Sequence, residues 1–353
     1  TPQSSGQLGG HKAQGRTAET AKLVVEDALA VQEAGAKMLL VEAVPPEVMK
    51  YIWETLTIPV LSIGAGPHCD GQLLIVIEIA GVERASTMEA MIKAAEKRGL
   101  IIHRAIATVG GSTYCDFQEL RDMAEMAKDA GIEMITTVGH RKGWDTGSKE
   151  ISTSEGQMQG FRLRGSDHIS YHIADIMRNI EAGHRGFLVY DEGVLFILNK
   201  MRDEGLIPAE TIFKFSVFGG YCSAAGAKVI ESMGANSMNP ISDVSLPILG
   251  GIRKTVDIPL DVYIIIVDSF GGMFRAYESP EIARVASPCY FKFEPGTSEG
   301  DIYKPWMTED FHVNLIQEKV KIASIVMEIM TKHAPELKTS GKGPEDLVLP
   351  LTV

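Results

Sequence analysis

The feature that most constrains the fold of this 353-residue chain is a series of eight short apolar segments between residues 73 and 332. Most of them are rich in Val, Ile, Phe and Tyr, which favour strands. They begin at Leu73, Leu100, Glu133, Gly186, Phe213, Ser237, Pro259 and Tyr290, with amphipathic helical patterns between them. Eight parallel strands that alternate with helices close a barrel, and about 250 residues suffice. The sequence therefore predicts an α/β fold with a (β/α)8 TIM barrel.

The residues before this series form two further strand and helix patterns. They predict a helix over residues 17–35 with Thr17 as its N-cap, a strand over 37–44, a helix over 45–56 and a strand over 58–66. Two more strands do not fit into an eight-stranded ring. We therefore predict three parts: a partial βα segment over residues 1–72, the barrel over 73–332, and a surface extension over 333–353.

Composition bears on the classes of partner. The chain has 34 Lys and Arg residues against 46 Asp and Glu, a net charge of -12. Because it has no excess of cations to neutralise phosphates, we expect no nucleic-acid partner. The longest apolar runs are of strand length, so we expect no membrane partner and a cytoplasmic location. A Met-rich helical face at residues 323–333 is typical of a core or of a subunit contact, which leaves a homo-oligomer open.

The cysteines do not form a recognisable site. Cys69, Cys115, Cys222 and Cys289 are widely separated, and none forms a CxxC pair. This spacing indicates buried free thiols rather than zinc ligands, iron–sulfur ligands or disulfides. Cys115 follows the Gly-rich stretch "ATVGGST", whose backbone N–H groups could also cup a phosphate. A simple turn is the more common role of such glycine pairs.

Polar side chains crowd the predicted carboxyl ends of the barrel strands. They are Glu78, His103, Arg104, His140, Arg141, Asp191, Glu192, Asn239, Asp243, Asp268, Lys292 and Glu294. Barrel enzymes build their active sites at this end. We therefore predict a pocket for an acidic small molecule, lined by His103, Arg104, His140, Arg141, Asp191, Glu192, Asn239, Lys292 and Glu294. Asp191 and Asp268 are the predicted metal ligands. The alternative is that these residues are helix caps and salt-bridged layers of the barrel.

Three stretches near the start of the chain carry a resemblance to a known family. They are "TPQSSGQLGGHKAQGRT" at residues 1–17, "MLLVEAVPPEV" at 38–48 and "IPVLSIGAGPHCDGQLLIV" at 58–76. Together they resemble the C-terminal half of ketopantoate hydroxymethyltransferase, and the resemblance ends near residue 76. That family transfers a one-carbon unit from methylenetetrahydrofolate to the oxo acid 2-oxoisovalerate, in pantothenate biosynthesis.

The resemblance implies a role for Glu42, in "VEAVP". The matching Glu of the family is the general base that takes a C3 proton from the oxo acid to give an enolate. The resemblance also implies Mg²⁺ and methylenetetrahydrofolate as cofactors. The family's acidic magnesium ligands lie on early strands that have no counterpart in this sequence. An active transferase and a diverged, inactive one are both compatible with this pattern.

The rest of the chain resembles another family more loosely. "GFLVYDEGVLFILNKMRDEG", the segment from Phe213 to Pro240, and "YFKFEPG" are similar to the barrel of the collagenase-like putative peptidases. This implies a TIM-barrel lyase or hydrolase that acts at the carboxyl ends of its strands. Motifs of metalloproteases and serine hydrolases, HExxH and GxSxG, are absent from the sequence. A further alternative is a non-catalytic fused or chimeric barrel.

Overall fold

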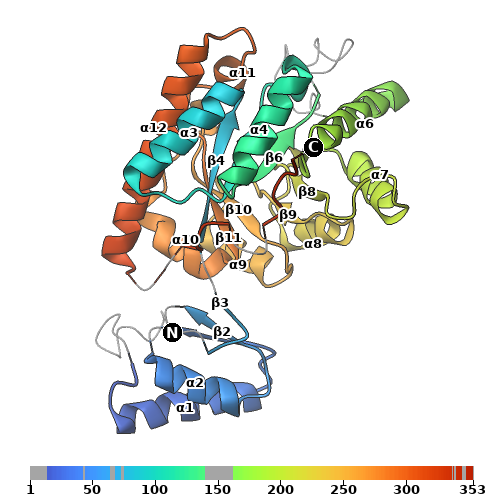
Figure 1. Ribbon diagram of the computed structural model, residues 1–353. Helices are drawn as coiled ribbons and strands as arrows, with labels where there is room; N and C mark the ends of the chain where they lie inside the picture. Colours follow the sequence, from blue (N-terminus) through green and yellow to red (C-terminus); the bar gives the residue numbers. More distant parts are fainter. Residues whose placement is uncertain are drawn as a thin grey trace. The chain divides into compact units, whose positions relative to one another are not determined.

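A computed structural model of the chain describes residues 14–42, 44–63, 68–72, 75–139, 162–335, 337, 339–343 and 347–352. The chain divides into two compact units (Figure 1). We call residues 1–75 and 330–338 the N-terminal unit, and residues 76–329 and 339–353 the barrel unit.

The barrel unit is built on a closed ring of parallel strands. In chain order these are β4 (Ile75–Val82), β5 (Arg104–Ala107), β6 (Glu133–Thr137), β7 (Gly186–Val189), β8 (Ile212–Phe215), β9 (Ser237–Met238), β10 (Leu260–Ile265) and β11 (Cys289–Phe293). The ring closes where β11 lies beside β4. Each of the eight predicted segments supplies one strand, so the predicted (β/α)8 barrel is confirmed, and it closes without the strands of the N-terminal unit.

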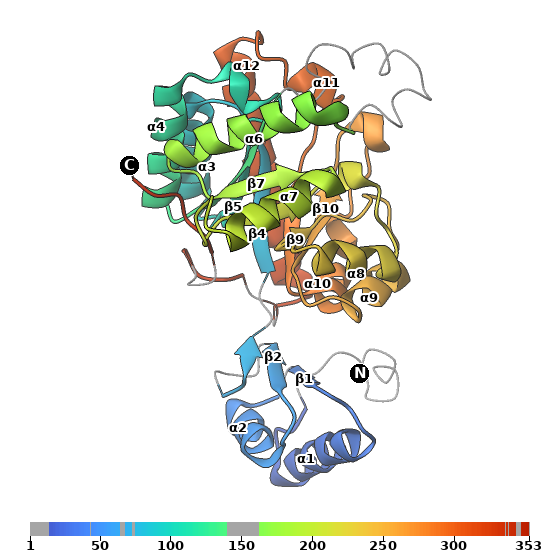
Figure 2. The same ribbon diagram turned by 90° about the vertical axis from the view of Figure 1, so that its right-hand side faces the viewer.

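Helices cover the outside of the ring (Figure 2). They are α3 (Ala85–Arg98), α4 (Phe117–Asp129), α6 (Gly165–Glu181), α7 (Glu192–Asp203), α8 (Ala224–Ser232), α9 (Leu246–Arg253), α10 (Ser279–Ala286), α11 (Glu299–Ile302) and α12 (Glu309–His333). Helix α4 illustrates why they form. Asp116 caps its first turn by accepting a hydrogen bond from the Glu119 N–H at 2.8 Å. Leu120, Met123 and Ala127 then recur at helical spacing and bury one face of the helix.

The N-terminal unit has a small sheet of its own. It contains α1 (Ala18–Glu33), β1 (Leu39–Glu42), α2 (Pro46–Thr55), β2 (Val60–Ile63) and β3 (Gly71–Gln72), with the strands in the order β1-β2-β3. As predicted, Thr17 caps α1, here in a reciprocal capping box with Thr20. Val41, Met49 and Val60 belong to the core of the unit.

The C-terminal residues after 338 pack along the amino ends of three barrel strands. The Val348 N–H donates to the Glu133 carboxylate at 2.9 Å, and the Leu351 N–H donates to the Gly183 carbonyl at 2.9 Å. The His103 ring accepts the Ile77 N–H at Nδ1, so its Nε2–H donates to the Ser340 carbonyl, 3.0 Å away. The predicted extension is therefore bonded to the barrel.

Strand β4 has an irregularity that only glycine tolerates. The register with β5 shifts between Ala80 and Val82, and Gly81 has φ +92°. A Cβ at Gly81 would lie 2.4 Å from Lys319 Nζ and 2.5 Å from Tyr303 Cε1. The backbone at this position therefore makes room for two buried side chains.

Gly81→Ala is expected to destabilise the fold more than Gly99→Ala. Both glycines have positive φ, but a Cβ at Gly99 would meet nothing within 4 Å. The left-handed backbone costs about 1–2 kcal/mol at each position, and overpacking adds about 1–3 kcal/mol at Gly81 alone. Urea unfolding of the two variants measures the difference. Equal losses of unfolding free energy would show that the crowding at Gly81 is relieved without cost.

Candidate active site

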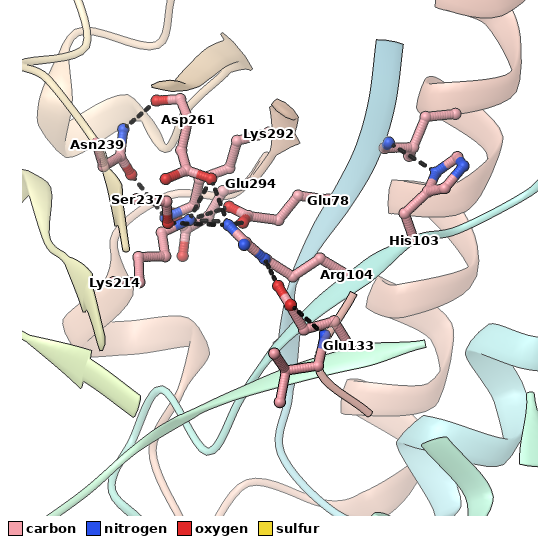
Figure 3. A network of polar contacts seen from close by, with 12 residues as sticks. Glu78, His103, Arg104, Glu133, Lys214, Ser237, Asn239, Asp261, Lys292 and Glu294 are labelled. Atoms are coloured by element: carbon pink, nitrogen blue, oxygen red, sulfur yellow. Dashed lines mark hydrogen bonds and ion pairs between the residues drawn. The ribbon is translucent and has the colours of Figure 1, made fainter. Parts of the chain in front are cut away.

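The inside of the ring holds a layer of buried charges (Figure 3). Glu78, Arg104 and Glu133 are side by side in the register of β4, β5 and β6. Arg104 Nε lies 2.5 Å from Glu133 Oε1, and its Nη1 lies 2.7 Å from Asp261 Oδ1. Lys214 Nζ lies 2.5 Å from Glu78 Oε1 and 3.2 Å from Asp261 Oδ1. Ion pairs between side chains of five strands therefore cross the interior.

This layer corrects the predicted position of His103 and Arg104. Strand β5 begins at Arg104, and β6 begins at Glu133, so the layer lies toward the amino ends of the strands. The sequence pattern extended the β5 strand too far back, because Leu100, Ile101 and Ile102 continue its apolar run. His103 binds the C-terminal residues instead of facing the carboxyl end.

Burial and mutual attraction set the charge states in this layer. Burial raises the pKa of Asp261 to about 6, against the attraction of Lys214 and with the added repulsion of Glu78. Burial lowers the pKa of Lys214, although Asp261 and Glu78 favour its charged form. The pKa of Glu78 is lowered, since the attraction of the nearby cations outweighs its burial. The charged groups of this layer interact chiefly with one another. We therefore interpret the layer as a structural support for the residues closer to the carboxyl ends of the strands.

A second cluster lies closer to the carboxyl ends. Lys292 pairs in register with Tyr263, two positions beyond the pairing of Tyr290 with Asp261. The Lys292 ammonium donates to Asn239 Oδ1 at 3.2 Å and lies 3.6 Å from Glu294 Oε2. It also lies over the Tyr263 ring, 4.4 Å from the ring centroid. The structure therefore brings together Asn239, Lys292 and Glu294, three of the residues predicted to line a pocket (Figure 3).

Phenol hydroxyls hold both oxygens of Glu294. Tyr263 donates to Oε2 at 2.9 Å, and Tyr303 donates to Oε1 at 3.1 Å. Burial, followed by the charge of Glu294, raises the pKa of both tyrosines well above its ordinary value. Both phenols therefore stay protonated at neutral pH and remain donors. The carboxylate of Glu294 is fixed in orientation beside a cation.

The Lys292 ammonium can donate a further hydrogen bond to a ligand oxygen. It carries three N–H donors. Within the part of the chain that the structure describes, it makes one hydrogen bond, to Asn239, whose own amide is held by the Asp261 carbonyl at 2.7 Å. A cation fixed in this way can bind a carbonyl or carboxylate oxygen of a ligand. The carboxylate fixed beside it can then remove a proton from the carbon next to that oxygen-bearing group, or return one to it.

The remaining predicted residues of the barrel do not join this cluster. Asp191 caps α7, with Oδ1 accepting the Val194 N–H at 3.2 Å. Glu192 accepts the Tyr221 hydroxyl at 2.8 Å and forms an ion pair with Arg162. Asp268 is exposed on the segment after β10. His140 and Arg141 lie outside the described residues.

The described residues form no cluster of metal ligands around Asp191 and Asp268. Across residues 14–139 and 162–352, apart from the short stretches left undescribed, no group of three or more His, Cys, Asp or Glu side chains is placed to hold a metal ion. Asp191 already serves as a helix cap, and Asp268 lies on the surface. Their role as metal ligands stays a prediction.

The backbone N–H groups of the Gly-rich stretch after β5 are bonded to a carboxylate of the chain itself. The N–H groups of Val109 and Gly110, which could have cupped a phosphate, donate to the two oxygens of Glu83 at 2.8 and 2.9 Å. Cys115 is a buried free thiol, as predicted, and burial raises its pKa to about 12. These contacts give the stretch a structural role. Of the other cysteines, Cys289 is buried, whereas Cys222 is exposed.

Glu42 belongs to the N-terminal unit. It is the last residue of β1, and its register partner is Ile63, the last residue of β2. Its backbone therefore stands at the carboxyl end of a parallel strand, as the sequence predicted.

Five buried residues of the two clusters were not predicted from the sequence: Lys214, Asp261, Tyr263, Tyr303 and Lys319. The first three could have been predicted from the alternation of inward-facing and outward-facing positions along a strand. Lys214 stands between two phenylalanines, and Asp261 and Tyr263 are two apart in β10. No local pattern distinguishes Tyr303 and Lys319, which lie outside the strands.

Comparison with known proteins shows a family likeness at the start of the chain. Residues 1–108 match the family model described as ketopantoate hydroxymethyltransferase. The 3-methyl-2-oxobutanoate hydroxymethyltransferase of Alkaliphilus metalliredigens (strain QYMF) is 64% identical over 87 residues, which are 25% of this chain and 30% of that protein. That of Bacillus subtilis (strain 168) is 52% identical over 86 residues, 24% of this chain and 31% of that protein. The chain spans about three-tenths of the length of these curated relatives.

The predicted resemblance of residues 1–76 is thus confirmed, and the family match extends beyond it. The family match continues to residue 108 and includes β4, α3 and β5 of the barrel. The motifs used for the prediction stop at Val76.

Solved structures resemble the chain at low sequence identity. The YdjI aldolase from Escherichia coli K12 has a TM-score of 0.45 and 14% identity, covering 76% of this chain and 93% of that chain. A U32 peptidase has a TM-score of 0.36 and 12% identity, covering 54% of this chain and 70% of that chain. Among the described helices, none combines the length and the apolar character needed to cross a membrane.

Proposed function

We propose that the barrel unit is an acid–base enzyme, of the lyase class, that acts on a small oxo acid. The observation that carries the proposal is the buried Lys292–Glu294 pair at the carboxyl ends of the strands, with 3.6 Å between Nζ and Oε2. This is the end where barrel enzymes place their reactive groups. The chain as a whole has an excess of acidic residues, which would repel an anionic oxo acid. Inside the ring, the positive charge of the Lys292 ammonium offsets this repulsion.

The roles follow from the chemistry of the pair. Lys292 binds the carbonyl oxygen of the substrate, and Asn239 keeps the ammonium in place. Glu294 takes a proton from the carbon next to the carbonyl, and the electrons of the broken C–H bond form an enolate. The negative charge that develops on the enolate oxygen lies against the Lys292 ammonium, which stabilises it. Return of the proton to carbon, or cleavage of a neighbouring carbon–carbon bond, completes the reaction.

The second candidate is hydroxymethyl transfer to 3-methyl-2-oxobutanoate by the N-terminal unit. It is favoured by the 64% identity over 87 residues to an enzyme of that name and by Glu42 at the end of β1. It would use Glu42 as the base and methylenetetrahydrofolate as the one-carbon donor. In this candidate Mg²⁺, which the family resemblance implies, would stabilise the negative charge of the enolate.

Lys292→Met is expected to weaken the binding of 3-methyl-2-oxobutanoate. Methionine retains much of the volume of the side chain but loses a charge-assisted hydrogen bond of about 1.5–3 kcal/mol. The Kd should therefore rise about 10- to 100-fold, measured by NMR titration of the ligand. The matched control is Lys200→Met, on an exposed face of α7. The proposal fails if the wild-type protein binds none of the small 2-oxo acids tested, or if the Lys292 variant binds them as the wild type does.

A further inference from the structure

Two buried ionisable side chains beside the Lys292–Glu294 pair have no part in the steps above. They are Tyr303, which follows α11, and Lys319, on α12. The Lys319 ammonium donates to the Tyr303 hydroxyl at 2.6 Å and to the Ala80 carbonyl at 2.7 Å. The Tyr303 hydroxyl in turn donates to Glu294 Oε1 at 3.1 Å. A continuous chain of hydrogen bonds therefore runs from Lys319 to Glu294.

The fold accommodates Lys319 at a cost. Its side chain is fully buried, and burying an ammonium carries a large desolvation penalty. An apolar side chain of similar volume would often stabilise such a position at least as well. At the register shift in β4, Gly81 leaves space for Lys319, because a Cβ at this position would stand 2.4 Å from Nζ. A basic group is thus retained where packing alone does not require one.

We infer that Lys319 is a positioning residue that holds a proton for Glu294 and passes it through the hydroxyl of Tyr303. This inference rests on the proposed role of Glu294 as the acid–base group. In the transfer, the Lys319 N–H proton moves to the Tyr303 oxygen while the Tyr303 O–H proton moves to Glu294 Oε1. An ammonium, a phenol and a carboxylate become an amine, a phenol and a carboxylic acid. The proton count is unchanged, and the reverse transfer restores the starting state.

The electrostatics around Lys319 suit this exchange. Burial lowers the pKa of Lys319 to about 8, against the attraction of Glu294, Glu83 and Glu299 and with the repulsion of Lys292. An ordinary lysine, with a pKa of about 10.4, would release its proton far less readily near neutral pH. Because Lys319 is protonated below this pKa, the supply of its proton to Glu294 is lost as the pH rises through about 8.

The first test needs no substrate. In the full chain with ¹³C-labelled lysine, NMR follows the titration of Lys319, assigned by the signal lost in Lys319→Met. We expect a midpoint near 8 that falls in Glu294→Gln, because the carboxylate favours the ammonium. The control is Glu318→Gln, whose exposed side chain pairs with Lys321 at 2.8 Å and should leave the midpoint unchanged. A midpoint near 10.4, or no response to Glu294→Gln, would overturn the inference.

The second test uses deuterium exchange of the oxo acid in D₂O as a function of pH. Tyr303→Phe keeps the ring but breaks the hydrogen-bond chain through which Glu294 and Lys319 exchange a proton, so the exchange rate should fall on the order of tenfold or more and should lose the change that the wild type shows as the pH passes through about 8. Lys321→Met, at an exposed position of α12, should retain the wild-type profile. A wild-type profile in Tyr303→Phe contradicts the inference. If the wild type shows no exchange, the proposed function fails, and the NMR titration decides the inference alone.

Discussion

Lys214→Met is expected to lower the free energy of unfolding by about 3–5 kcal/mol, the cost of removing one partner from a buried ion pair. Lys214 is fully buried and has its ammonium between Glu78 and Asp261, at 2.5 and 3.2 Å. Methionine fills much the same volume, so loss of packing contributes little. The loss arises because two buried carboxylates are left with Arg104 as their nearest cation, 3.5 Å from Glu78. Denaturant unfolding measures the change.

The control for this prediction is again Lys200→Met. Its ammonium lies over the ring of Phe196, 5.1 Å from the centroid, on an exposed face of α7. We expect a change within about 0.5 kcal/mol, as for most surface substitutions. If Lys214→Met unfolds at the same denaturant concentration as Lys200→Met, the charges inside the ring do not hold the barrel together in the way described.

Glu294→Gln is expected to slow deuterium exchange of 3-methyl-2-oxobutanoate by about 10²–10⁴-fold, the usual contribution of a general base. Glutamine has nearly the same shape, and one of its atoms can still accept a phenol hydrogen bond. It cannot take a proton from carbon at neutral pH. The rate of exchange at C3, followed by ¹H NMR in D₂O, measures the loss.

Two controls make this result specific. The unfolding transition of Glu294→Gln shows whether the variant is folded at the temperature of the assay. Glu89→Gln removes an exposed carboxylate that pairs with Lys93 on α3, and it should leave the exchange rate unchanged. A folded Glu294→Gln protein with the wild-type rate would remove Glu294 from the chemistry.

The architecture of the barrel could be predicted from the sequence because its signal is local and repeated. Each strand is a short apolar run between turn signals, and each helix has an apolar face at its own period. Segments of only two residues, such as β9 at Ser237–Met238, were still found because a strand was expected at that place in the alternation. The ends of the strands were less certain, as His103 and Arg104 show.

The site could be predicted only in part, because its contacts join residues far apart in the chain. Asn239 and Glu294 directly follow β9 and β11, and Lys292 is the last but one residue of β11, which marks all three as carboxyl-end residues. Asp191 has the same local signal, yet it caps a helix. Only the spatial arrangement separates the two cases. The hydrogen bond from Lys319 to the Ala80 carbonyl joins residues 239 positions apart, and no local sequence pattern in either segment predicts it.

The family likeness and the candidate site lie in different parts of the chain. The match to the transferase family ends at residue 108, whereas the pair proposed to carry the chemistry lies at residues 292 and 294. Two carboxylates are therefore candidates for the same kind of step, removal of a proton next to a carbonyl. They are Glu42 in the N-terminal unit and Glu294 in the barrel unit, and a single assay compares them.

That assay is deuterium exchange at C3 of 3-methyl-2-oxobutanoate by the full chain, carried out with Glu42→Gln and Glu294→Gln side by side. If the barrel carries the chemistry, Glu42→Gln exchanges at the wild-type rate and Glu294→Gln loses the activity. If instead Glu42→Gln abolishes exchange and Glu294→Gln retains it, the activity belongs to the N-terminal unit, and the barrel site proposed above is wrong.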